Sequence, residues 1–228
     1  MKQVAKHCVV TAKAGSTTAI EIWKDIDVPG SNYKFLQARN PYHRFVSIFT
    51  FRFAMVNGNR AARASIDPND YDAREKEDLR QQVRSSFMIR NPEQGTRNES
   101  FRSFFYNVIK IHDADKQSDD HIRLQTVPTI PVDDIIFLHK LPEAYLIPAS
   151  KLGIDLDISK VPEMMVTNKR DDVDWSEYSV PDITVEEWWD FGGTPSDYGL
   201  FYDDELLDEV YEYYKQDFDF LGIRKGEL

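Results

Sequence analysis

The clearest indication of the fold lies near the N-terminus, in residues 3–38, which read QVAKHCVVTAKAGSTTAIEIWKDIDVPGSNYKFLQA. Residues 3–12 are β-branched and apolar toward their end, which predicts a buried strand. A Gly/Ser/Thr turn follows, after which residues 17–25 have the pattern of a short helix and Tyr33–Ala38 that of a second strand. This order is typical of a βαβ unit, so we expect parallel strands joined by a right-handed crossover.

The remaining chain extends this unit into an α/β domain. Asn40 can cap a helix that begins at Pro41 and runs to about Met55. Four further elements are predicted: a helix at Phe101–Ile109, a buried strand at Ile135–Leu138, a helix at Leu141–Leu152 and a closing helix from Asp203 to about Phe218. Residues 57–98 are polar and predict an insertion or lid, with a helix at Tyr71–Phe87. We therefore expect one domain over residues 1–228, with a small parallel sheet flanked by helices.

Composition excludes several classes of protein. With 41% apolar and 13% aromatic residues, the 228-residue chain can bury a sizeable core. No run of about 18 apolar residues and no signal-like start is present, so we do not expect a transmembrane or secreted protein. One cysteine, Cys8, and five scattered histidines offer neither an intramolecular disulfide nor a metal site. We therefore expect a soluble cytoplasmic protein, of bacterial or viral origin, with no membrane partner.

Charge is distributed unevenly along the chain. Residues 1–110 carry 18 Lys and Arg against 11 Asp and Glu, whereas residues 111–228 carry 10 against 28. The early cations suit a small anionic ligand, and the acidic remainder would repel a nucleic acid. The alternative is two solvated faces that differ in charge without a ligand.

The first candidate site is the segment Lys13-Ala-Gly-Ser-Thr-Thr18, where the first strand ends and the first helix begins. Backbone amides at a helix N-terminus favour a phosphate, glycine lets the backbone approach it, and lysine adds a positive charge. The candidate binding residues are Lys13, Gly15, Ser16, Thr17 and Thr18. An ordinary strand-to-helix turn is the alternative. A nucleoside-triphosphate P-loop requires the order Gly-Lys-Ser/Thr, whereas here the lysine precedes the glycine.

The second candidate site is the segment Arg39-Asn-Pro-Tyr-His-Arg-Phe-Val-Ser47, at the end of the next strand. Arg39 lies at the carboxyl edge of the predicted sheet, where doubly wound sheets bind ligands, and Ser47 lies two helical turns beyond Pro41. Arg44 is interpreted as a structural cation that pairs with a carboxylate or a helix C-terminus.

Together the two segments resemble the nucleotide-binding signature of sulfotransferases that use 3′-phosphoadenosine 5′-phosphosulfate (PAPS), particularly carbohydrate sulfotransferases. The family's Lys-x-Gly-x-Thr loop holds the 5′-phosphosulfate and is matched by Lys13, Gly15 and Thr17. Its Arg-Asp/Asn-Pro-x-x-Arg-x-x-Ser element holds the 3′-phosphate and is matched by Arg39–Ser47. The resemblance implies a P-loop NTPase-like fold, PAPS as the sulfuryl donor with adenosine 3′,5′-bisphosphate as product, and a hydroxyl acceptor, which we expect to be a carbohydrate.

Three further segments resemble the family in the same order along the chain. Phe101–Ile109 with His121–Gln125 is similar to an aromatic helix and a downstream His-x-x-x-Gln segment, and Tyr214–Gly222 is similar to the closing helix. Asn168-Lys169 is similar to an element of the loop that covers the cofactor, which implies that Asn168 and Lys169 bind the cofactor.

The chain also departs from the family. Only 20 residues separate Thr18 from Arg39, and the catalytic histidine that glycan sulfotransferases carry in this interval has no counterpart. His139-Lys140 stands where the family has an acid after its third strand. The acceptor site of better-known relatives therefore cannot be transferred.

Sulfuryl transfer needs an in-line nucleophile, charge stabilisation on the leaving phosphate and a base for the acceptor hydroxyl. We expect Lys13 to neutralise the leaving phosphate. His121 is the first candidate for the base, because imidazole titrates near neutrality, and a solvated loop histidine is the alternative. Glu21 and His43 are lesser candidates. Packing or surface roles are expected for the other histidines: His7, His112 and His139.

The sequence thus predicts a PAPS-dependent sulfotransferase. Two alternatives stay open. One is a P-loop-like nucleotide kinase, which would depend on ATP and magnesium. The other is a degenerate nucleotide-binding protein without activity.

Overall fold

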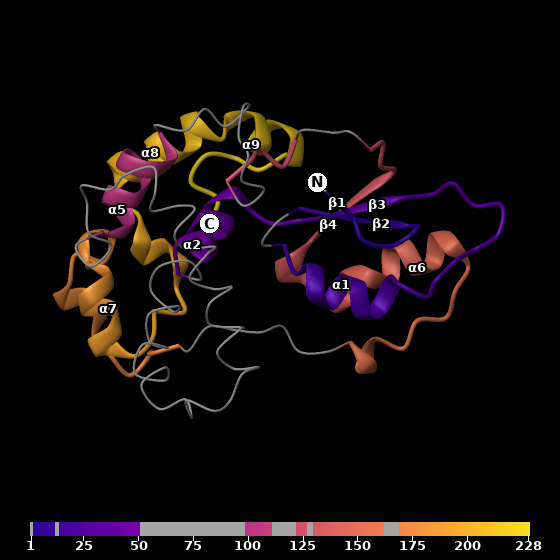
Figure 1. Ribbon diagram of the computed structural model, residues 1–228, viewed down its shortest axis with the longest axis horizontal. Helices are drawn as coiled ribbons and strands as arrows, with labels where there is room; N and C mark the ends of the chain where they lie inside the picture. Colours follow the sequence, from indigo (N-terminus) through magenta and orange to yellow (C-terminus); the bar gives the residue numbers. More distant parts are fainter. Residues whose placement is uncertain (1, 12–13, 51–98, 111–121, 127–129, 162–168) are drawn as a thin grey trace, which may run out of the picture. The chain divides into compact units, whose positions relative to one another are not determined.

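The computed structural model describes residues 2–11, 14–50, 99–110, 122–126, 130–161 and 169–228 (Figure 1). The chain divides into two compact units. The sheet unit comprises Met1–Phe45, Asp113–Met165 and Asp208–Leu228, and the aromatic unit comprises Val46–His112 and Val166–Leu207. The predicted insertion at 57–98, with its helix at Tyr71–Phe87, lies outside the described residues. A single domain over the whole chain stays a prediction.

A small open sheet forms the centre of the sheet unit and confirms the predicted α/β class. Its strands, in spatial order, are β1 (Lys2–Gln3), β2 (Cys8–Val10), β3 (Phe35–Ala38) and β4 (Asp134–Phe137). Strands β2, β3 and β4 are parallel, and β1 is antiparallel to β2. The carboxyl ends of the three parallel strands therefore meet at one edge of the sheet.

The first strand differs from the prediction. We expected one strand over residues 3–12, whereas the chain turns between β1 and β2. Val4 N donates to Cys8 O at 3.0 Å, and Cys8 N donates to Ala5 O at 3.3 Å. These bonds close a tight turn, so the short β1 pairs back onto β2 as an edge strand.

The helices around the strands follow local signals in the sequence. Helix α1 (Ser16–Trp23) connects β2 to β3, as predicted. Helix α2 begins at Pro41 and is described as far as Phe49, and Asn40 Oδ1 caps it by accepting from Tyr42 N at 2.9 Å. This hydrogen bond confirms that Asn40 caps the helix, as predicted.

The helix after β4 starts later than predicted. Two 3-10 turns, Leu138–Lys140 and Glu143–Tyr145, precede α6 (Leu146–Leu152), whereas we expected a helix from residue 141. Pro142 lacks an amide hydrogen, which disfavours an α-helix through this point. The predicted end is confirmed, because Gly153 takes the left-handed conformation with φ of 66°.

Both faces of the sheet are covered within the sheet unit (Figure 1). Helices α1 and α6 lie together under one face, where Trp23 packs against Phe35 at 4.8 Å and Tyr145 at 5.6 Å between ring centroids. On the other face, Leu36 packs with Leu221 of α9 (Lys215–Leu221). This alternation of faces along β3 is the period expected of a buried strand.

The closing helix predicted from residue 203 to 218 is two helices. Helix α8 spans Asp204–Tyr213, α9 follows it, and Tyr214 between them has φ of −101° and ψ of 19°, which are not helical values. Tyr214 and Phe218 are both buried, and Phe218 contacts Tyr42 at 4.7 Å between ring centroids. The break therefore serves tertiary packing and has no local signal such as Gly or Pro.

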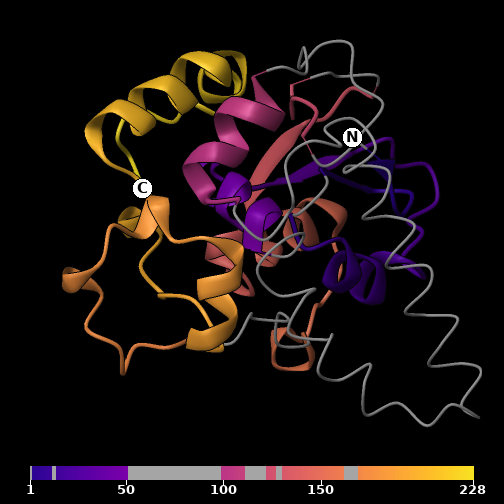
Figure 2. The ribbon, with the colours of Figure 1, turned by 60° about the vertical axis from the view of Figure 1, so that its left-hand side comes forward.

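The described part of the aromatic unit contains several short helices (Figure 2). Among its described residues are α5 (Phe101–Phe104), which continues as a π-helix over Phe105–Ile109, α7 (Val185–Phe191), and 3-10 turns at Trp175–Glu177, Val180–Asp182 and Tyr198–Phe201. Phe101 packs edge-on against Phe201 at 5.2 Å, and Trp188 stacks on Phe201 at 5.6 Å. Trp188 is therefore a core residue.

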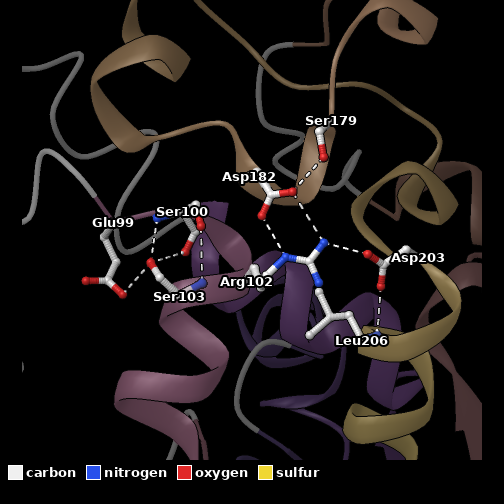
Figure 3. Close-up of polar contacts among 8 residues, drawn as sticks. All are labelled: Glu99, Ser100, Arg102, Ser103, Ser179, Asp182, Asp203 and Leu206. Atoms are coloured by element: carbon white, nitrogen blue, oxygen red, sulfur yellow. Dashed lines mark hydrogen bonds and ion pairs between the residues drawn. The ribbon is translucent and has the colours of Figure 1, made fainter.

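A charged clamp ties three segments of the aromatic unit together (Figure 3). Arg102 of α5 donates from Nε to Asp182 Oδ1 at 2.6 Å and from Nη2 to Asp203 Oδ2 at 2.5 Å. Ser179 Oγ donates to Asp182 Oδ2 at 2.6 Å, and Asp203 Oδ1 accepts from Leu206 N at 2.9 Å. The Arg102 guanidinium lowers the pKa of both carboxyl groups below its usual range.

Arg102→Met should lower the free energy of unfolding by about 1 kcal/mol at neutral pH, because the ion pairs are only partly shielded from water. Because the pKa values of Asp182 and Asp203 are lowered in the folded protein, their ion pairs with Arg102 stabilise the fold above about pH 4. This stabilisation is lost as pH falls through the lowered pKa values and the carboxylates are protonated. The difference from wild type should therefore shrink in urea titrations carried out at about pH 3.

The exposed pair Lys160–Asp157, three residues apart, provides the control: Lys160→Met should change stability little. A loss in Arg102→Met that stays the same at acidic pH would show that its packing, and not its charge, is responsible.

Candidate functional site

The first predicted phosphate loop lies at the start of α1, at the carboxyl edge of the sheet. Gly15 precedes the helix with φ of 76°, and Ser16 and Thr17 are exposed, whereas Thr18 is buried. A Cβ at position 15 would lie 2.5 Å from Leu138 Cδ1 and 2.8 Å from Gln37 Nε2. Both the conformation and the close approach therefore require glycine here.

A buried glutamine of the neighbouring strand holds this loop. Gln37 Nε2 donates to the carbonyl oxygens of Ala14 and Gly15, at 3.1 Å for Gly15. Its Oε1 accepts from Tyr145 Oη at 2.6 Å. Because Gln37 is fully buried, each of these hydrogen bonds replaces a hydrogen bond to water. The Gln37 side chain thereby fixes the loop backbone at Ala14 and Gly15. Sequence reasoning missed Gln37, although a glutamine within Phe35–Ala38 is the signal that could have found it.

A second buried glutamine joins the ends of two parallel strands. Gln125 Oε1 accepts from Thr11 Oγ1 at 2.8 Å, just past β2, and from Arg39 N at 3.2 Å, just past β3. Gln125 Nε2 donates to Arg39 O at 2.8 Å. The backbone at Arg39 is thus held on both its polar groups by one side chain. Gln125 belongs to the His-x-x-x-Gln segment, for which the sequence predicted a role only for His121.

The segment Ile122–Thr126, which carries Gln125, is itself anchored at its backbone. Tyr214 Oη donates to Ile122 O at 3.2 Å, and Arg44 Nη2 donates to Arg123 O at 2.6 Å. Three of the segments that resemble the sulfotransferase signature therefore meet within the sheet unit: the one that contains Arg44, the one that contains Gln125 and the one that contains Tyr214.

Arg44 is the structural cation that the sequence predicted. Its side chain is 2% exposed, and its Nη1 lies 3.9 Å from Oδ2 of Asp217, which is fully buried. Asp217 Oδ1 accepts from Thr126 N at 2.8 Å. Burial raises the pKa of Asp217, and the Arg44 charge opposes that rise.

The carboxyl edge of the sheet also gathers basic side chains, which we call the cationic edge: the cations Arg39 after β3 and Lys140 after β4, together with the imidazole of His139. Burial, Lys140 and Arg39 lower the pKa of His139, and Glu227 acts in the opposite direction. His139 is exposed, which agrees with the surface role, one of the two roles that the sequence left open for it. Its electrostatic interaction with Arg39 was not predicted, because the two residues are far apart in the sequence.

The structure places the other predicted site residues as follows. Ser47 is half-buried on α2 and belongs to the aromatic unit. Lys169 belongs to the same unit, where its Nζ donates to Pro195 O at 2.9 Å and lies 4.5 Å from the centre of the Tyr198 ring. That Ser47 and Lys169 join Arg39 at one ligand stays a prediction. Three predicted residues lie outside the described part of the chain: Lys13, His121 and Asn168.

The remaining candidates for a base differ in their surroundings. His7 is buried, and its Nε2 accepts from Val28 N at 3.2 Å, so its Nδ1 donates to Tyr33 O at 2.7 Å. These bonds confirm a packing role for His7. Glu21 is exposed on α1 and His43 is half-buried on α2, whereas His112 is not described.

Comparisons with known proteins find no matching family model, no matching curated protein and no matching solved structure. Within the described residues, no helix is long and apolar enough to cross a membrane. The described part of the chain likewise holds no group of three or more His, Cys, Asp or Glu residues that could bind a metal ion.

Arg44→Met should lower the free energy of unfolding by about 3–5 kcal/mol at neutral pH, because it leaves the Asp217 carboxylate buried without its cation. Loss of Arg44 removes the main opposition to the raised pKa of Asp217. Protonation then relieves the buried charge, so the loss of stability should shrink as pH falls from about 7 to about 5.

The double variant Arg44→Met with Asp217→Asn completes a double-mutant cycle. Urea denaturation of the wild type, the two single variants and the double variant measures the four free energies of unfolding. It should be more stable than the sum of the two single losses indicates, because neither charge is left alone. Additive losses with no dependence on pH would show that the two side chains do not interact.

Proposed function

We propose that this protein is a PAPS-dependent sulfotransferase that transfers a sulfuryl group to a hydroxyl acceptor, a carbohydrate being the acceptor class that the sequence favours. The observation that supports this most is the pair of buried glutamines. Gln37 holds the backbone before α1, and Gln125 holds the backbone at Arg39. The two segments for which we predict anion binding are thereby held at the carboxyl edge of one parallel sheet, which supports the proposal of a P-loop-like nucleotide site.

The assignment of residues to the two phosphate groups follows the motifs. Lys13 and residues 15–18 would bind the 5′-phosphosulfate, because the exposed hydroxyls of Ser16 and Thr17 accompany the first amides of α1. Arg39 would bind the 3′-phosphate. For Ser47, Asn168 and Lys169, a role in cofactor binding rests on the resemblance alone.

The reaction requires little covalent chemistry from the protein. The acceptor oxygen attacks sulfur in line, the bond between sulfur and the 5′-phosphate oxygen breaks, and the acceptor proton passes to a base, for which His121 is proposed. Lys13 and the amides of α1 would stabilise the charge that develops on the leaving phosphate. The bisphosphate product then dissociates.

Adenosine 3′,5′-bisphosphate should raise the melting temperature more than adenosine 5′-phosphate does, because Arg39 would bind the additional 3′-phosphate. At about 100 times its dissociation constant, a ligand stabilises the fold by about 2.7 kcal/mol. Arg39→Met should remove most of the difference between the two nucleotides, whereas Lys151→Met, at an exposed cation of α6, should leave it intact. Equal shifts for the two nucleotides in the wild-type protein would disprove the 3′-phosphate site.

Lys13→Ala should slow sulfuryl transfer by about 100-fold while weakening binding of the bisphosphate less, because the lysine would act on charge that grows in the transition state. Release of sulfate from PAPS into water measures the reaction without a known acceptor. The exposed Lys24 offers a matched Lys24→Ala control. A normal rate in Lys13→Ala would show that this lysine is not catalytic. Transfer of phosphate from ATP in the presence of magnesium would contradict the sulfotransferase proposal and support the kinase alternative.

A further inference from the structure

The turn after β4 lies beside both predicted anion-binding segments. Ala38 of β3 pairs with Phe137 of β4, so the residues that follow, Arg39 and Leu138–Lys140, leave the sheet at the same edge. The Leu138 side chain also lies against Gly15, where an added Cβ would come within 2.5 Å of it. His139 is therefore the residue next to a direct contact of the phosphate loop.

The charges around His139 favour an anion. Lys140 follows it in the same 3-10 turn, and two more charged residues act on its imidazole: Arg39 at the end of β3 and Glu227 in the segment after α9. Glu227 is held near this edge because its carbonyl oxygen accepts from Asn40 Nδ2 at 2.6 Å. Two cations and one carboxylate thus act on an exposed imidazole. Their charges sum to one net positive charge, and protonation of the imidazole adds a second.

We propose that His139 joins Arg39 and Lys140 in binding one dianionic tetrahedral group, and that binding of this group is coupled to uptake of a proton by the imidazole. The inference rests on the proposed function, in which Arg39 binds the 3′-phosphate of the nucleotide. His139 becomes the residue that makes recognition of this phosphate depend on pH.

The sign of the pH dependence follows from the charges. Without a ligand, burial and the neighbouring cations lower the pKa of His139, so its imidazole is neutral at neutral pH. A bound dianion favours the imidazolium and raises this pKa. Affinity is then highest at acidic pH and falls by up to tenfold per pH unit between the pKa of the free protein and that of the complex.

Inorganic sulfate is the first probe, because it stays dianionic across the pH range and any change in its affinity comes from the protein. Titration calorimetry should show an affinity about tenfold higher near pH 6 than near pH 8 for the wild-type protein. His139→Gln should bind weakly and His139→Lys tightly, and both should lose the dependence on pH. Lys151→Gln, a cation of α6 in the same unit, should behave as wild type.

Proton magnetic resonance of the wild-type protein gives a measurement that needs no variant. Sulfate should raise the pKa of His139 and leave the resonances of His7 unchanged, because both ring nitrogens of His7 are bonded to backbone groups. An unchanged His139 titration, or a His139→Gln variant with the same pH dependence as wild type, would overturn the inference.

Adenosine 3′,5′-bisphosphate is the second probe and separates this inference from the proposed function. When His139 binds the 3′-phosphate, the bisphosphate should raise the pKa of His139 as sulfate does, whereas adenosine 5′-phosphate should leave this pKa unchanged. Sulfate binding with the expected pH dependence, together with equal affinity for the two nucleotides, would support the anion site and reject its assignment to a 3′-phosphate.

Discussion

The site depends on one buried amide. Gln125 accepts from Thr11 and from the backbone of Arg39, and it donates to the Arg39 carbonyl, so it joins the ends of β2 and β3. A buried amide that makes these bonds is costly to disturb, because any unpaired polar group would be left without water. The position of the Arg39 backbone therefore follows from the position of Gln125.

Gln125 is held in turn by a buried charge pair. Arg44 binds the carbonyl of Arg123, Asp217 binds the amide of Thr126, and the two charges lie 3.9 Å apart. Burying both charges costs free energy that their attraction only partly offsets, so stability alone does not explain the pair. Its hydrogen bonds to the segment that carries Gln125 explain it better: they fix the segment on both sides of the glutamine.

The distribution of charge in the sequence has a local counterpart in the sheet unit. The chain is acidic overall, with a net charge of −11, yet Arg39, His139 and Lys140 gather at the edge of the sheet beside Gly15. A local excess of positive charge of this kind suits a small anion, such as the phosphate groups of the proposed nucleotide. The proposed nucleotide and the inferred pH dependence both follow from this contrast.

Sequence alone determined the elements whose signals are local. The parallel β2 and β3 with α1 between them, the start of α2 at Pro41 and the end of α6 at Gly153 each follow from propensity, capping or periodicity within a few residues. The structural role of Arg44 was also predicted from its place in a motif.

Tertiary structure decided what depends on distant partners. The break at Tyr214, the bond between Tyr145 and Gln37, 108 residues apart, and the bond between Thr11 and Gln125, 114 residues apart, have no local signal. The interaction of His139 with Arg39 is of the same kind. A side chain's partner and its protonation are set by what the fold brings beside it, and a sequence read in short windows does not contain that information.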